Sequence, residues 1–234
     1  VGCVGAFDER GQKMARSVAP LLQKWGVSIG ILGAEEHCDG NEVRSLGERG
    51  LFEQMAKKNI QLFQELNVQK IITLSPHAYN VLKNDYPQLG GAFEVHHYSQ
   101  VIGRLIKKVN PRPKENPLKV TFHDPCYLGR HNKEYRAPRT VLRSLSGIRL
   151  IEMDRSKDDA LCCGGGGGNF FTDLLGRGPD SPARARVREA AETGVEVLVV
   201  ACPNCAKMLE DGVKAEVLED KLKVMDLAEL VQAP

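Results

Sequence analysis

The chain has 234 residues, of which 42% are hydrophobic and 26% are charged, a composition typical of a globular protein that excludes a disordered or collagen-like chain. Basic and acidic residues (32 against 30) leave a net charge of +2, so the charge gives no reason to expect nucleic acid or an anionic membrane as a partner. No apolar run reaches the roughly 20 residues of a transmembrane helix, and a first residue other than Met leads us to expect a piece of a longer protein.

Short apolar runs alternate with amphipathic stretches along the first half of the chain. The pattern predicts strands at 1–6, 27–32, 70–74 and 93–97, and helices at 9–25, 43–66, from 76 onward and at 100–109. A segment rich in Pro and Lys, 107–117, is then expected to be a linker.

The second half repeats this alternation. Strands are predicted at 118–123, 149–153 and 195–201, and helices at 137–145, 182–193 and 203–213. Strands that are apolar throughout, separated by helices, indicate a parallel sheet covered on both faces. The arginines of helix 182–193 are interpreted as part of a solvated face; they are Arg184, Arg186 and Arg188.

The two halves are copies of one unit. Offsets of 123, 124 and 127 residues superpose three pairs of motifs: Cys126 on Cys3, Cys162-Cys163 on Cys38-Asp39, and Cys202 to Cys205 on Ser75 to Ala78. We therefore expect two tandem, duplicated α/β domains of Rossmann-like parallel-sheet form, at 1–110 and 118–234.

Cysteines concentrate in the second copy. Five of the seven lie there, and the carboxyl ends of the predicted strands bring them to one edge of the sheet. The adjacent pair Cys162-Cys163 can reach two corners of a polynuclear cluster but strains a single tetrahedral ion, so the pattern favours a polynuclear metal site. Structural zinc held by four of the five, a redox disulfide at Cys202/Cys205 and simple buried thiols remain as alternatives.

Five consecutive glycines, 164–168, follow the cysteine pair, without the strand or the Lys-Ser/Thr sequence of a phosphate loop. Gly164 and Gly165 are expected to surround a bulky cofactor, because backbone without Cβ approaches closely and its N–H groups can bond to sulfur. A flexible linker is the alternative. Near Cys126, His123 could donate a hydrogen bond or a proton and Arg130 could offset negative charge.

The run His123 to Arg130 around Cys126, with Cys162-Cys163-Gly164 and Cys202-x-x-Cys205, resembles the cysteine-rich CCG domain of heterodisulfide reductase catalytic subunits and related iron–sulfur oxidoreductases. The resemblance implies that two such domains form one unit and that a complete five-cysteine set holds a 4Fe-4S cluster of noncubane form. The ligands it implies here are Cys126, Cys162, Cys163, Cys202 and Cys205.

The same resemblance implies a redox partner. Members of the family exchange electrons with ferredoxin-type clusters, a flavoprotein, a quinone or a membrane haem subunit, in a partner or in another part of a longer chain. A cytoplasmic location follows, with any membrane attachment made through a partner or an N-terminal part.

The first copy departs from the family pattern, since it keeps Cys3 and Cys38 but has Asp39, Ser75 and Ala78 at the other cysteine positions. We expect no iron–sulfur cluster there. Cys3, Cys38, Asp39 and His77 have ligand types that suit one zinc ion, although an empty cleft is the favoured interpretation.

One cluster instead of two favours single-electron relay as the function. Direct reduction of a disulfide or a similar substrate at that cluster is the alternative within the same class. A non-redox scaffold with structural zinc is the alternative from another class, and its weakness is the fifth cysteine, because a closed zinc site uses four ligands.

Overall fold

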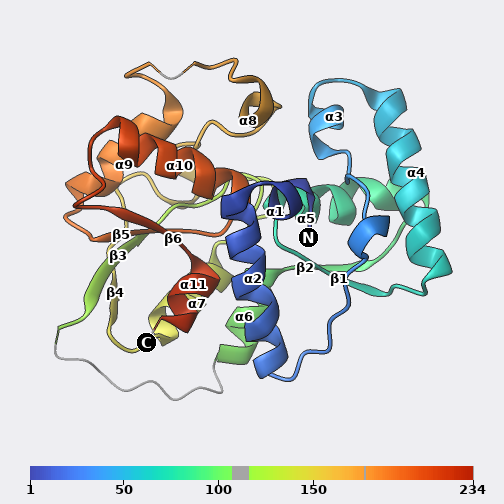
Figure 1. Ribbon diagram of the computed structural model, residues 1–234, viewed down its shortest axis with the longest axis horizontal. Helices are drawn as coiled ribbons and strands as arrows, with labels where there is room; N and C mark the ends of the chain where they lie inside the picture. The colour runs from blue at the N-terminus through green and yellow to red at the C-terminus, as the bar shows by residue number, and fades with distance from the viewer. Residues whose placement is uncertain (107–115, 177, 234) are drawn as a thin grey trace.

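A computed structural model describes residues 1–106, 116–176 and 178–233. Each half of the chain contributes a parallel sheet, and helices lie around both (Figure 1). The predicted mixed α/β class with parallel strands is confirmed. No helix in these ranges is long and apolar enough to cross a membrane.

The second-half sheet has the order β4-β3-β5-β6. Its strands are β3 (Leu118–Phe122), β4 (Ile148–Leu150), β5 (Val197–Val200) and β6 (Lys223–Asp226). All four residues of β5 are buried, as a strand with helices on both faces requires. The helices of this half are α7 (Arg136–Ser144), α8 (Asn169–Thr172), α9 (Pro182–Glu192), α10 (Pro203–Ala215) and α11 (Leu227–Gln232).

Two of these elements, β6 and α11, were not predicted. They are the counterparts of β2 and α6 in the first half. Asp226 begins α11 with a capping box, in which its side chain accepts from the Ala228 amide and the Glu229 carboxylate accepts from the Asp226 amide. That Asp-x-x-Glu signal was present in the sequence.

In the first half, β1 (Lys70–Thr73) and β2 (Glu94–His97) pair in parallel and confirm two predicted strands. The predicted strand at 1–6 is wrong, because these residues form the short helix α1 (Cys3–Phe7). Residues 27–32 run from α2 (Glu9–Lys24) to the 3-10 turn η1 (Gly33–Glu35) and are not a strand, since they pair with no strand in the described part of the chain.

The long helix predicted at 43–66 is two helices, α3 (Asn41–Ser45) and α4 (Arg49–Glu65). Gly47 between them has φ = 93°, a conformation that glycine adopts without strain and that ends a helix. The rest of this half consists of α5 (Pro76–Asn80), the π-turn η2 (Val81–Asp85), the 3-10 turn η3 (Tyr86–Leu89) and α6 (Tyr98–Leu105). Most of the predicted linker lies outside the described residues.

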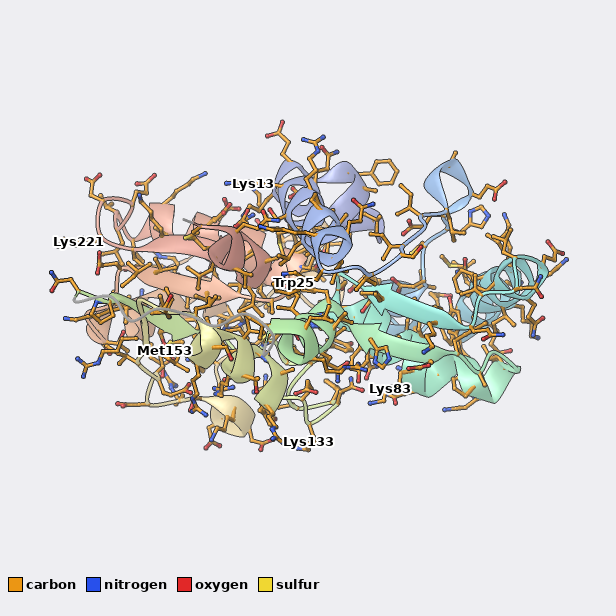
Figure 2. The ribbon with its side chains drawn as sticks, turned by 90° about the horizontal axis from the view of Figure 1, so that it is seen from below. Lys13, Trp25, Lys83, Lys133, Met153 and Lys221 are labelled. Carbon is orange, nitrogen blue, oxygen red and sulfur yellow. The ribbon has the colours of Figure 1, made fainter. Side chains whose placement is uncertain are left out.

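The two halves share one core. Helix α2 of the first half packs on α10 and α11 of the second, and α6 packs on α7. In the repeat α2 corresponds to α7 and α11 to α6, so the α2–α11 and α6–α7 contacts are equivalent under an approximate two-fold relation. Trp25, directly after α2, lies near the middle of the molecule between the halves (Figure 2).

A buried charge crosses the same junction. The Arg10 guanidinium in α2 donates to both carboxylate oxygens of Glu229 in α11, at 2.7 Å each, and to Glu210 in α10. Arg10 is only 8% exposed, so this contact is shielded from solvent and fixes α2 on the second half.

Candidate metal centre

Five cysteines meet at the carboxyl ends of β3 and β5. Cys126 lies in the loop after β3, Cys202 is the N-cap of α10 directly after β5, and Cys205 follows in the first turn of α10. The Cys162-Cys163 pair comes from the loop between β4 and α8. In this sheet the chain leaves β3 and β5 toward opposite edges, and ligands of open parallel sheets bind at such a switch point.

The sulfur atoms form one contiguous group. The Cys163 and Cys205 Sγ atoms are 3.2 Å apart, and thiol hydrogen bonds join Cys126 to Cys162, Cys162 to Cys163 and Cys202 to Cys205. None of the five is in a disulfide. Cys163, Cys202 and Cys205 are buried, whereas Cys126 and Cys162 are partly exposed. The structure therefore brings together all five cysteines that the sequence singled out.

The thiols divide into donors and acceptors of these hydrogen bonds. Bonds from Cys126 and Cys163 lower the pKa of Cys162 to about 2. Burial opposes ionisation of Cys202, but bonds from Cys205 and His77 lower its pKa to about 5. The thiols that donate to these sulfurs have raised pKa values. A protein with two thiolates already formed is prepared to bind a cationic metal group, which takes cysteine as thiolate.

His123 supplies an independent sign of a bound group. The Arg186 Nε donates to His123 Nδ1 at 3.2 Å, so the neutral imidazole carries its proton on Nε2. Burial, followed by the Arg186 charge, lowers the pKa of His123 to about 3 and keeps it neutral. Its Nε2 is buried and has no partner among the described residues, and a ring nitrogen of His123 lies within 4.8 Å of the Cys163 and Cys205 sulfurs. An unpaired buried donor beside thiolates fits a sulfide-containing cluster.

Buried ion pairs hold the loops that carry the cysteines. Arg139 in α7 donates to both oxygens of Asp124 at 2.7 and 2.9 Å, and to both oxygens of Glu152 at 2.8 Å. Asp124 also accepts from the Lys157 amide at 2.8 Å. The segment before Cys126 is thereby tied to α7 and to the loop that leads to Cys162.

The interpretation of Arg186 as part of a solvated face is wrong, because it is 0% exposed. Its guanidinium donates to Glu189 at 2.6 Å and to the Arg155 carbonyl at 2.8 Å, besides His123. The sequence did hold the signal: Ala183 and Ala190 lie three before and four after Arg186, which places the arginine on the apolar stripe of α9.

The glycine run borders the site. The Gly164 amide donates to the Cys162 sulfur at 3.2 Å. A Cβ at Gly165 would lie 2.9 Å from the Met208 Cγ, so only glycine fits against α10. The Gly168 amide reaches the first half, where it donates to the Glu42 carboxylate at 2.7 Å. Arg130 donates to the Ala160 carbonyl at 2.7 Å and so fixes the backbone two residues before Cys162.

The first-copy residues are arranged differently. Cys3 and Cys38 share a thiol hydrogen bond, and Asp39 is adjacent. Within the described ranges, the group of His, Cys, Asp and Glu side chains close enough to hold one ion is His123, Cys163 and Cys205. The structure does not bring Cys3, Cys38, Asp39 and His77 into such a group.

His77 belongs instead to the second-copy site, where it hydrogen-bonds Cys202. Burial lowers its pKa, but the bond to Cys202 and the charges of Cys202, Glu42 and Asp39 outweigh this and leave the pKa above its ordinary value. Its ring lies 4.4 Å from that of Tyr127, which stacks on His131 at 4.5 Å. Sequence reasoning missed Tyr127, because an aromatic residue beside a ligand carries no spacing signal.

Comparison with known proteins matches this chain to the cysteine-rich CCG domain at residues 1–83 and 120–210. The probable iron-sulfur-binding oxidoreductase FadF of Bacillus subtilis is 43% identical over 99% of this chain and 33% of its own length. The EtfAB:quinone oxidoreductase of Syntrophomonas wolfei is 38% identical over 98% of this chain and 33% of its own length.

A third relative belongs to the dihydromethanophenazine:CoB--CoM heterodisulfide reductase of Methanosarcina barkeri, as one of its subunits, and is 33% identical over 98% of this chain and 56% of its own length. The chain thus spans about a third to a half of the relatives it matches. Two matches to one domain agree with the internal repeat, and this chain belongs to the CCG cysteine-rich domain family.

Proposed function

We propose that this chain is an electron-transfer module of an iron–sulfur oxidoreductase and that its second copy holds one 4Fe-4S cluster. The proposed ligands are Cys126, Cys162, Cys163, Cys202 and Cys205, and five thiolates fit the noncubane form of cluster that the family resemblance implies. The observation that carries the proposal is the contiguous five-sulfur group with the unpaired His123 Nε2 beside it. When bound, the cluster would supply one-electron transfer.

The burial of the cysteines suggests a path for the electron. Three of the proposed ligands are buried, and the two partly exposed ones, Cys126 and Cys162, define the side from which a redox partner can approach. The relatives' names include a quinone oxidoreductase and a membrane-anchored ferredoxin. We therefore propose that donor or acceptor groups belong to other parts of a longer chain or to a membrane-attached partner.

Single-electron relay is favoured over direct two-electron reduction of a disulfide, because the described structure assembles a ligand group in one copy alone. Structural zinc is disfavoured, since four ligands would leave one of five adjoining sulfurs unused.

The first test is the metal content of the protein purified without oxygen. The proposal predicts about four irons and four acid-labile sulfides per chain, with an electron paramagnetic resonance signal in one redox state. About one zinc without iron, even after anaerobic reconstitution, would refute it, and about eight irons would refute the assignment of a single site.

Replacing His123 with Leu is expected to lower the reduction potential of the bound cluster. An N–H donor stabilises the more negatively charged reduced state, and about 1 kcal/mol of difference between the two states corresponds to roughly 40 mV for one electron. The measurement is a redox titration followed by paramagnetic resonance. His131→Leu, a nearby partly exposed histidine, is the control, and an equal shift in both variants would contradict a specific role for His123.

A further inference from the structure

An apolar groove of about 740 Å³ runs along β1 in the first half. One wall is the segment 27–32, including Ile29 and Ile31, and the other is β1 with Ile71 and Ile72. Ile31 is 72% exposed, although it is a large apolar residue. Monomeric proteins rarely leave such contiguous apolar surface uncovered without a partner for it.

The second half shows what lies at the equivalent place. There β3 pairs with β4 on one side and with β5 on the other, so it is the central strand of its sheet. In the repeat β5 corresponds to β1, and β4 corresponds to the segment 27–32. The β1 groove is therefore the position of a strand equivalent to β3.

The backbone of β1 has the matching polarity. The Gln69 carbonyl accepts from Glu94 and so faces β2, and alternate residues of a strand direct their backbone groups to opposite edges. Ile72 then directs its amide and carbonyl into the groove. Its counterpart, Val199, uses its carbonyl to accept from the His123 amide at the end of β3, at 2.9 Å.

We propose that the β1 groove binds a β-strand of about five residues, parallel to β1, from the polypeptide on the N-terminal side of Val1. The offset of 123 residues that superposes Cys126 on Cys3 places the counterpart of β3 directly before Val1. The relatives have the chain length to supply it, since this sequence covers 33% of the first two. The strand completes a four-stranded sheet and places Cys3 after a central strand, as Cys126 is placed after β3.

The groove lining favours this occupant over a small molecule. A strand offers backbone groups to Ile72 and to residues 28–31 and apolar side chains to both walls, whereas a lone apolar ligand would leave those backbone groups unpaired. The pairing partners on both sides are already held in place, by β2 for β1 and by α2 and η1 for residues 27–32.

The test extends the chain with a copy of its own strand. The sequence of residues 118–123 is placed directly before Val1, and the matched control carries Ser at the positions copied from Leu118, Val120 and Phe122. We expect the copied strand to raise the melting temperature by about 4 °C or more relative to the control. We also expect it to slow hydrogen exchange at the Ile72 amide.

Addition of Ile72→Lys to the extended chain should abolish both effects, because a buried lysine opposes occupation of the groove. The proposal is overturned if the copied strand and its serine control melt and exchange alike. It is equally overturned if the Ile72 amide of the unextended chain gains protection as protein concentration rises, because the occupant is then a second copy of the chain.

Discussion

Replacing Cys163 with Ser is expected to reduce iron and sulfide to less than half of the content of the unmodified chain, and to change or remove the paramagnetic signal. Cys163 is 3% exposed and lies between Cys162 and Cys205 in the sulfur group, so the hydroxyl would interrupt the group at its centre. Serine is a poorer ligand for iron than thiolate. The measurements are iron and sulfide analysis and resonance spectra of anaerobically purified protein.

The matched control is Cys38→Ser in the first copy. Cys38 is exposed and its thiol contacts Cys3, not the second-copy sulfurs, so its replacement should leave the iron content and spectrum unchanged. Equal losses in the two variants would contradict a single site in the second copy. Circular dichroism of both variants separates loss of the cluster from loss of the fold.

The second large effect is expected from Arg139→Met. Asp124 is 3% exposed, and the variant leaves its carboxylate buried without its bidentate partner. Removal of one member of a buried ion pair costs about 3–5 kcal/mol, which lowers the melting temperature of a chain of this size by roughly 10 °C. Thermal and urea unfolding under anaerobic conditions measure this loss.

Two variants sharpen that result. Arg143→Met lies on the same helix at an exposed position and should cost less than about 0.5 kcal/mol. Adding Asp124→Asn to Arg139→Met removes the unpaired charge and should restore part of the lost stability. If Arg139→Met were as mild as Arg143→Met, the ion pair would not be what holds the loop before Cys126.

The sequence predicted the second half well because its signals are local. Continuous Val and Leu in β5, Pro at the start of α9 and α10, and the cysteine spacing each act within a few residues. The same methods were wrong at 1–6 and 27–32, where the outcome depends on a neighbouring strand. An apolar run forms a strand only when its backbone groups find partners.

The site shows the same division. Spacing was enough to single out the cysteines, His123 and the glycines next to the pair. It could not show that His77, from the other half and 125 residues before Cys202, donates to that cysteine, nor that Arg186 fixes the proton of His123 on Nε2. These contacts arise from tertiary packing, and a single sequence carries no pattern for them.

The approximate two-fold relation between the halves makes the molecule a covalently joined dimer whose two halves have diverged. Each half covers an apolar helix face of the other, so the copy without a complete cysteine set still stabilises its twin and gives His77 and Glu42 to the twin's site. A duplicated copy held in this way can lose its own metal ligands while natural selection continues to preserve its fold.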